Sequence, residues 1–253
     1  MSKLLSPRGR LLMVRGGKLL ALLAATALSA CVVQPAYVPP PRVYAPPPPP
    51  PPPVAVEADA GGGAVEVTAT EAPPPLPDYE QPPCPEDGYL WTPGYWHYGA
   101  VGYYWVPGTW VQPPSVGVLW TPGYWGFAGG VYGFHAGYWG PHIGFYGGLN
   151  YGFGYGGVGF VGGRWDGGHY RYNTAITNVD VKNVHNTYVD HTVVKAVTGP
   201  NHAFNGRGGI TAQPSRGEAE AARAPHQGPT QAQASHAQEA HNSHLAAHGA
   251  PRR

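Results

Sequence analysis

A six-residue aromatic motif repeats along the middle of the chain and restricts the folds open to it. WTPGYW occurs at residues 91–96 and again at 120–125, WVPGTW at 105–110, and the variant FHAGYW at 134–139. The copies start at residues 91, 105, 120 and 134, so their spacings are 14, 15 and 14 residues. Each spacing holds two short strands and two turns. We therefore predict a mainly β fold, an antiparallel meander of short strands built from these aromatic repeats.

The first three copies contain a Pro-Gly step, which suits the two central positions of a type II turn. Proline fixes φ at about −65°, and glycine accepts the positive φ that follows. A reversal at this step would place Trp91 opposite Trp96 on one face of a hairpin. Type II turns splay two-residue hairpins, so the step can instead be a corner or bulge, with tighter hairpins at residues 99–102 and 129–130. The predicted turn-forming residues are Pro93, Gly94, Pro107, Gly108, Pro122 and Gly123.

Tryptophan rings supply much of the side-chain volume available for a core. Leucine and isoleucine are scarce after residue 85, and each buried ring removes roughly 150–250 Å² from water, on the order of 4–6 kcal/mol as an upper estimate. We interpret most of these rings as core. The alternative is an exposed ladder of rings that stacks on sugars. The residues of this candidate packing or ligand surface are Trp91, Trp96, Trp105, Trp110, Trp120, Trp125 and Trp139.

The N-terminus has the layout of a secretory signal. Five basic residues precede an apolar run, residues 19–28, which is too short to span a bilayer. The run ends in the residues LSAC, positions 28–31, which closely resemble the lipobox where bacterial lipoprotein signal peptidase cuts after the cysteine is acylated. We therefore predict that residues 1–30 are a lipoprotein signal peptide and that Cys31 is the lipidation site. An ordinary signal peptide with a chance cysteine and a buried core helix are the alternatives.

Acylation of Cys31 would tether the mature protein to a membrane. Each buried methylene contributes roughly 0.8 kcal/mol, so the two or three acyl chains typical of this class hold almost permanently. Val32 follows the cysteine. Resemblance to the Gram-negative sorting rule, in which aspartate at this place retains a lipoprotein in the inner membrane, implies the outer membrane. We predict a lipid-anchored protein of the bacterial outer membrane on its periplasmic face.

Composition divides the mature chain into three segments. Residues 31–76 are proline-rich, with eight prolines in a row at 46–53, and such a run forms an extended polyproline spacer. A proline-rich ligand for a partner domain is the alternative. Residues 77–198 carry the repeats and a glycine-rich stretch, and we predict that they form the aromatic β domain. In residues 199–253 glycine, proline, alanine, glutamine and histidine prevail, so we predict a disordered tail.

Charge and side-chain chemistry exclude several classes of function. Residues 1–30 hold five of the fifteen Lys and Arg and none of the fourteen Asp and Glu, so the mature net charge is 10 − 14 = −4. Nucleic acid is therefore not an expected partner. With Cys31 acylated, Cys84 is the only thiol left, so no intrachain disulfide is expected. No spacing matches a catalytic or metal site, so we predict no enzyme activity, cofactor or metal. A metal bound by a helical His241, His244 and His248 is the alternative.

Several stretches of the chain resemble one family. The WXPGXW copies, the lead-in PPCPEDGYLWTPGYW at 82–96, and the stretches GPHIGFYGG and NYGFGYGGVGF closely resemble the WXXGXW (YXWGXW) repeat-containing bacterial lipoprotein family over roughly residues 77–197. Its members are largely exported proteins and lipoproteins without an established activity, so the resemblance implies location and architecture.

Together these features predict a lipid-anchored cell-envelope protein with a structural or protein-docking role and no catalysis. The alternative is a glycan-binding module that uses exposed Trp and Tyr rings to hold peptidoglycan or an exopolysaccharide. The expected partners are the membrane, through the acyl anchor at Cys31, and an envelope protein or glycan. The oligomeric state stays open.

Overall fold

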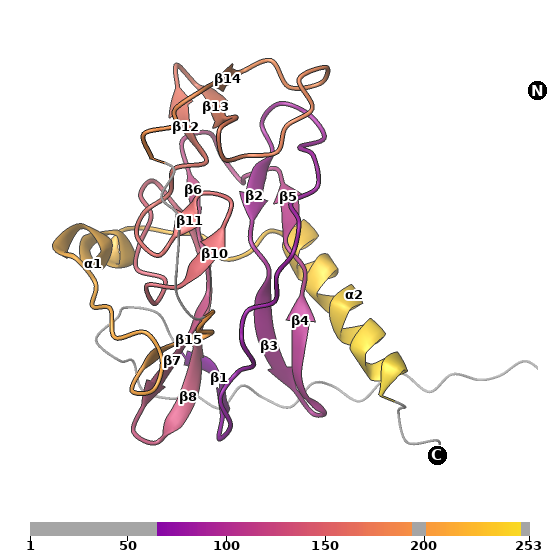
Figure 1. The fold of residues 1–253 in the computed structure, drawn as a ribbon, viewed down its shortest axis with the longest axis vertical. Coiled ribbons are helices and arrows are strands. Elements are labelled where there is room, and N and C mark those ends of the chain that lie inside the picture. The colour runs from indigo at the N-terminus through magenta and orange to yellow at the C-terminus, as the bar shows by residue number, and fades with distance from the viewer. Residues whose placement is uncertain (1–64, 194–200, 249–253) are drawn as a thin grey trace, which may run out of the picture. The chain divides into compact units, whose positions relative to one another are not determined.

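The computed structural model describes residues 65–193 and 201–248 (Figure 1). The predictions for the signal peptide, for Cys31 and for most of the proline-rich tether lie outside these residues. The described residues contain fifteen strands and two helices, and most strand pairs are antiparallel. The predicted mainly β fold of short antiparallel strands is therefore confirmed. No helix within the described ranges is long and apolar enough to cross a membrane.

Every repeat copy forms two strands, one on each side of its third and fourth residues. The eight repeat strands are β2 (Leu90–Thr92), β3 (Tyr95–Gly99), β4 (Gly102–Val106), β5 (Thr109–Val111), β6 (Leu119–Thr121), β7 (Tyr124–Ala128), β8 (Val131–His135) and β9 (Tyr138–Gly140). The copies pair two by two. In the first repeat pair, residues 90–111, β3 pairs with β4 and β2 with β5. In the second repeat pair, residues 119–140, β7 pairs with β8 and β6 with β9.

The Pro-Gly steps lie between paired strands and do not reverse the chain. Trp91 lies opposite Trp110, and Trp96 lies opposite Trp105, so the predicted pairing of Trp91 with Trp96 is wrong. The hairpins close at residues 99–102 and 128–131, as the corner alternative predicted. None of the step glycines has φ in the left-handed region, which excludes a type II turn. The turn-forming role was predicted for Pro93, Gly94, Pro107, Gly108, Pro122 and Gly123, and it is wrong at all six.

The remaining strands extend the repeats and form separate small sheets. They are β1 (Val65–Ala69), β10 (Asn150–Gly152), β11 (Tyr155–Gly156), β12 (Gly163–Asp166), β13 (His169–Asn173), β14 (Thr187–Tyr188) and β15 (Phe204–Gly206). β1 and β15 flank the second repeat pair in a sheet of order β1-β8-β7-β15, β10 pairs with β11, and β13 lies between β12 and β14. The described strands thus fall into six sheets, so the meander is discontinuous.

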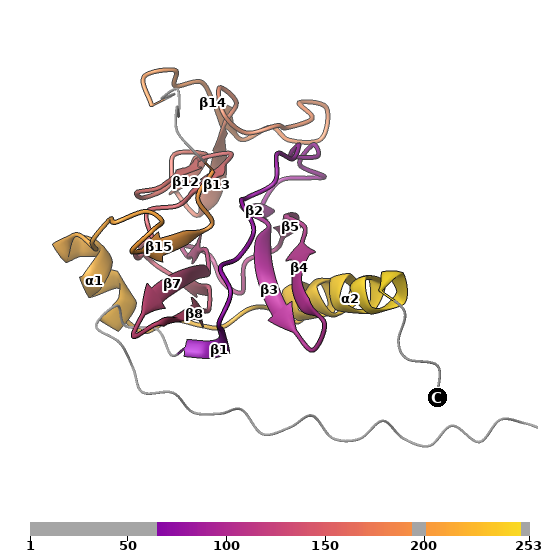
Figure 2. The same ribbon diagram turned by 60° about the horizontal axis from the view of Figure 1, so that its bottom comes forward.

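The tail predicted to be disordered from residue 199 is instead folded over residues 201–248. It contains β15 and two helices, α1 (Arg216–Arg223) and α2 (Gln231–Ala247). Ser215 and Thr230 begin the helices, each with a capping box, which satisfies free N–H groups of the first turn. A short helix is only marginally stable by itself, so tertiary contacts supply the remaining stability of these two helices. Figure 2 shows the two helices on opposite sides of the repeats, with α2 alongside β4 and β5.

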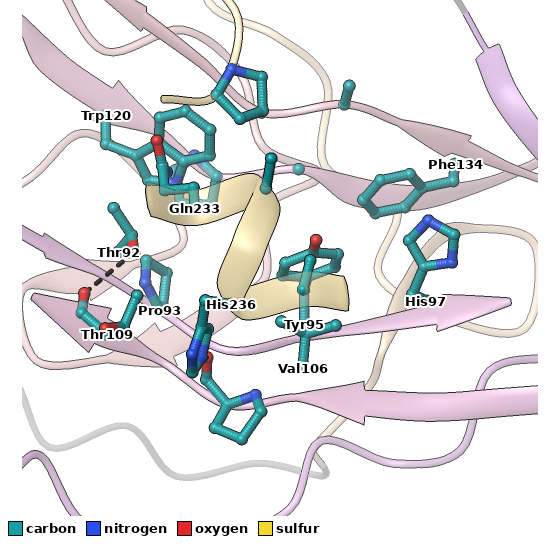
Figure 3. Close-up of a pocket in the computed structure, with 18 of the residues that line it drawn as sticks. Thr92, Pro93, Tyr95, His97, Val106, Thr109, Trp120, Phe134, Gln233 and His236 are labelled. Atoms are coloured by element: carbon teal, nitrogen blue, oxygen red, sulfur yellow. Dashed lines mark hydrogen bonds between the residues drawn. The ribbon is translucent and has the colours of Figure 1, made fainter. Parts of the chain in front are cut away.

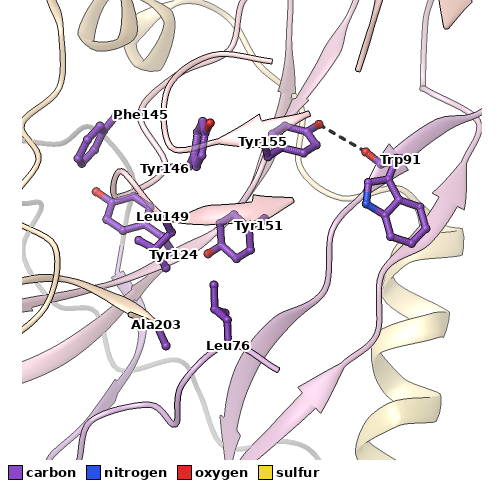
Figure 4. Packing of buried hydrophobic residues seen from close by; sticks show 9 residues of the cluster. All are labelled: Leu76, Trp91, Tyr124, Phe145, Tyr146, Leu149, Tyr151, Tyr155 and Ala203. Carbon is purple, nitrogen blue, oxygen red and sulfur yellow. Dashed lines mark hydrogen bonds between the residues drawn. The ribbon is translucent and has the colours of Figure 1, made fainter. Parts of the chain in front are cut away.

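The core is aromatic and joins both repeat pairs to the glycine-rich segment. In the cluster of Figure 4, Tyr146, Tyr151 and Tyr155 of residues 146–155 are buried together with Trp91 of the first repeat pair and Tyr124 of the second. A second cluster surrounds Trp120 and Trp139. Aromatic residues outnumber leucine and valine among the buried members of both clusters, so aromatic rings form the larger part of the core.

Candidate functional site: the paired aromatic repeats

The first aromatic residue of each repeat packs on the glycine of the partner repeat. In the first repeat pair a Cβ added at Gly94 would overlap the indole of Trp105 and lie 2.9 Å from the backbone nitrogen of Gly108. Reciprocally, a Cβ at Gly108 would overlap the indole of Trp91 and lie 3.0 Å from the nitrogen of Gly94. The two glycines therefore allow a close crossing of backbones beneath two indole rings.

The second repeat pair repeats this arrangement. A Cβ at Gly137 would overlap Trp120, and a Cβ at Gly123 would lie 2.8 Å from the ring of Phe134. The degenerate fourth copy has lost its first tryptophan, yet Phe134 still provides a ring at that place. The first and fourth positions of the WXXGXW motif are thus linked by contact between copies, which the sequence of a single copy does not reveal.

The tryptophans of the motif are enclosed to different degrees. Trp91, Trp120, Trp125 and Trp139 are buried, with exposed fractions of 2%, 7%, 2% and 0%. Trp96, Trp105 and Trp110 are half-buried. The ring N–H of Trp96 donates to the carbonyl of Pro75 at 3.2 Å, and that of Trp110 donates to the carbonyl of Pro82 at 2.8 Å. The chain before the repeats therefore lies against the half-buried rings.

Hydrogen bonds from aromatic side chains fasten the two repeat pairs together. The Trp125 ring N–H donates to the carbonyl of Trp96 at 2.8 Å. From the glycine-rich segment, the Tyr155 hydroxyl donates to the carbonyl of Trp120 at 2.9 Å, and the Tyr151 hydroxyl to that of Gly123 at 2.7 Å. Sequence reasoning missed both tyrosines as cross-links, and the signal available was their place among glycines, where a ring can approach backbone closely.

Alkaline pH is expected to destabilise the protein. Burial raises the pKa of Tyr151, Tyr155 and Tyr170 well above the usual value. The folded state favours the neutral phenol. Its contribution to the free energy of unfolding is therefore complete below the unfolded-state pKa of about 10 and is lost as the pH rises from there towards the folded-state pKa. We expect the free energy of unfolding to fall above about pH 10, by up to roughly 1.4 kcal/mol per pH unit for each tyrosine. Denaturant titrations followed by tryptophan fluorescence at stepped pH measure this.

Tyrosinate absorbance, recorded on the same samples, provides the control. The absorbance of these three tyrosines should develop together with unfolding. Their ionisation near pH 10 in the native protein, with no loss of stability, would contradict the assigned burial.

Other reactive side chains are enclosed or already in contact with neighbours. Cys84 is a free, buried cysteine whose thiol donates to the carbonyl of Glu86 at 3.3 Å, and burial raises its pKa to about 11. In the tail, His244 packs against Tyr104 and against His248, with ring centroids 5.4 and 4.1 Å apart. Within residues 65–193 and 201–248 no three His, Cys, Asp or Glu side chains are grouped so that they could hold a metal.

The repeats thus define a class of β protein in which paired aromatic motifs form the interior of a scaffold. The family model for the WXXGXW repeat matches two copies over residues 87–111, which contain the first repeat pair. The chain therefore contains WXXGXW repeats in the first repeat pair. The second repeat pair lies beyond the matched residues but has the same cross-copy register, with Trp120 opposite Trp139. No curated protein and no solved structure matches the chain.

Proposed function

We propose that this protein is anchored by acyl chains on Cys31 to the periplasmic face of the bacterial outer membrane, where it serves a structural or protein-docking role without catalysis. The LSAC sequence at residues 28–31, after a basic and apolar leader, supports the anchor. The structural or docking role is supported mainly by one observation, which is that the aromatic rings of the repeats form the interior. Rings used in this way build a rigid scaffold that displays other residues.

Two hairpin tips on one side of this scaffold are available to meet a partner. The β3–β4 and β7–β8 hairpins end on the same side of the fold (Figure 1), and each tip carries an exposed valine, Val101 and Val131. Apolar side chains on exposed, rigidly held tips favour contact with another protein. An envelope protein is therefore the proposed partner.

The second candidate function is glycan binding by aromatic rings. It rests on the half-buried Trp96, Trp105 and Trp110, since stacking on sugars requires an open ring face. This candidate has weaker support, because the tryptophans of residues 91–165 are all buried or half-buried and none is exposed.

Photocrosslinking in intact cells tests the docking role. With p-benzoylphenylalanine in place of Val101 or Val131, we expect a discrete adduct with another envelope protein. Val181 is a matched control, since it is exposed and belongs to the β13–β14 connection at the other end of the fold (Figure 1). We expect no adduct there. Adding Cys31→Ser should move the protein to the soluble fraction and abolish the tip adducts, because the anchor holds it beside its partner.

Two results would count against the proposal. If Cys31→Ser protein still sediments with membranes, the proposed lipid anchor is wrong. Tip adducts that disappear on digestion of peptidoglycan, with no protein component, would favour the glycan alternative instead.

A further inference from the structure

The third residues of all four repeats meet around one cavity. Pro93 and Pro107 of the first repeat pair and Pro122 and Ala136 of the second line a space of about 310 Å³. The rings of Tyr95, Trp120 and Phe134 form further parts of its wall (Figure 3). The volume lies within the range of small-molecule sites, at its lower end. Because every copy contributes, the cavity is a product of repeat pairing and not a gap beside one loop.

Helix α2 covers this cavity with small side chains. Ala234 and Ala237 lie on the lining. Gln233 and His236 of the same helix also belong to it (Figure 3). The helix is held there by Gln233, whose side-chain oxygen accepts the ring N–H of Trp139 at 2.8 Å, and by a 2.9 Å contact between Nε2 of His236 and the carbonyl of Pro107. Ala237 is half-buried and Ala234 is exposed at the rim of the lining, so neither small side chain fills the space next to the helix.

Several polar groups on the wall already have partners. The Thr92 hydroxyl donates to the carbonyl of Thr109 at 3.0 Å. The Gln233 side-chain oxygen also accepts the backbone N–H of Thr230 at 2.8 Å. Burial lowers the pKa of His97, so its imidazole is neutral at pH 7. A sugar would bring many hydroxyls to a wall with few free partners, and unpaired polar groups are costly when buried.

The Tyr95 hydroxyl is one of the polar groups left for a ligand. Within the described part of the chain the Tyr95 hydroxyl has no hydrogen-bond partner, although Tyr95 lines the cavity. The only charged residue on the wall is Glu66, which is exposed. A ligand that fits these walls is therefore flat and uncharged, with at most one or two polar atoms.

We propose that the cavity under α2 is a binding site for an uncharged aromatic molecule of one or two fused rings that carries a hydroxyl or N–H group. Its ring packs between Tyr95, Trp120 and Phe134 and the repeat prolines, and its polar group meets the Tyr95 hydroxyl. This activity is independent of the docking role, because the hairpin tips take no part in it.

Calorimetric titration of the purified full chain with 2-naphthol tests the site. We expect saturable, one-to-one binding. Ala237→Phe fills the cavity from helix α2 and should weaken binding by about tenfold or more. Ala234→Phe, at an exposed position on the rim of the lining, is a second filling variant from the same helix, so the test does not depend on one substitution. Ala232→Phe is the matched control, because Ala232 is an exposed α2 residue off the lining, and it should bind as the parent does.

Three outcomes would overturn the proposal. The first is that 2-naphthol shows no saturable binding to the parent. The second is that Ala232→Phe weakens binding as much as the filling variants do. The third is that 2-naphthol does not bind, whereas glucose binds saturably and the filling variants weaken its binding. The last would assign the cavity to a sugar. Thermal melts of all four proteins show whether a loss of binding reflects lost folding.

Discussion

Gly94→Ala is expected to lower the free energy of unfolding by about 2–3 kcal/mol. The added methyl would overlap the indole of Trp105 and lie 2.9 Å from the backbone nitrogen of Gly108. The half-buried indole of Trp105 is in contact with the rings of Tyr79 and Trp96, and a backbone nitrogen cannot rotate away. The two copies of the first repeat pair must therefore move apart. Urea unfolding followed by tryptophan fluorescence measures the change.

Gly156→Ala is the matched control for this substitution. Gly156 also lies in a strand, β11, but a Cβ there meets nothing within 4 Å, and its φ is outside the left-handed region. We expect a change of less than about 0.5 kcal/mol. Equal effects of the two substitutions would show that the Trp–Gly contact between copies is not what requires glycine in the motif.

Trp139→Ala is expected to be the most damaging single substitution, with a loss of about 3–5 kcal/mol. Trp139 is completely buried, its ring lies 5.2 Å from that of Trp120, and its N–H donates to the side chain of Gln233. Truncation leaves a cavity between the second repeat pair and α2 and also frees the oxygen that holds the helix. Calorimetric melting temperature and helical circular dichroism together measure both effects.

Trp139→Phe separates the ring from its hydrogen bond. It keeps an aromatic ring in the core but removes the N–H donor and part of the ring area, so we expect a loss of about 1–2 kcal/mol, smaller than that of Trp139→Ala. Val116→Ala, at an exposed position, should have almost no effect. If Trp139→Ala lowered the free energy of unfolding no more than Val116→Ala does, the assignment of Trp139 to the core would be wrong.

Local sequence predicted the elements better than it predicted their partners. The 14- and 15-residue spacings of the repeats indicated short strands, and the hairpins at Gly99–Gly102 and Gly129–Gly130 were foreseen as one alternative. The type II turn prediction was wrong because that turn requires glycine at positive φ. Here Gly94, Gly108 and Gly123 lie outside the left-handed region and pack closely against the neighbouring copy. The folded tail was missed because composition reports low hydrophobicity and not the capping boxes at Ser215 and Thr230.

The sequence by itself determined the strand lengths, because the repeat spacing limits them. It also determined that the core is aromatic, because only aromatic side chains offered enough apolar area. Tertiary structure alone decided which copy pairs with which, because a six-residue motif cannot cover its own indole. The covering surface comes from the glycine of another copy and from Tyr151 and Tyr155, far away in sequence. The cavity under α2 exists only once four copies and the tail are assembled, so no single segment encodes it.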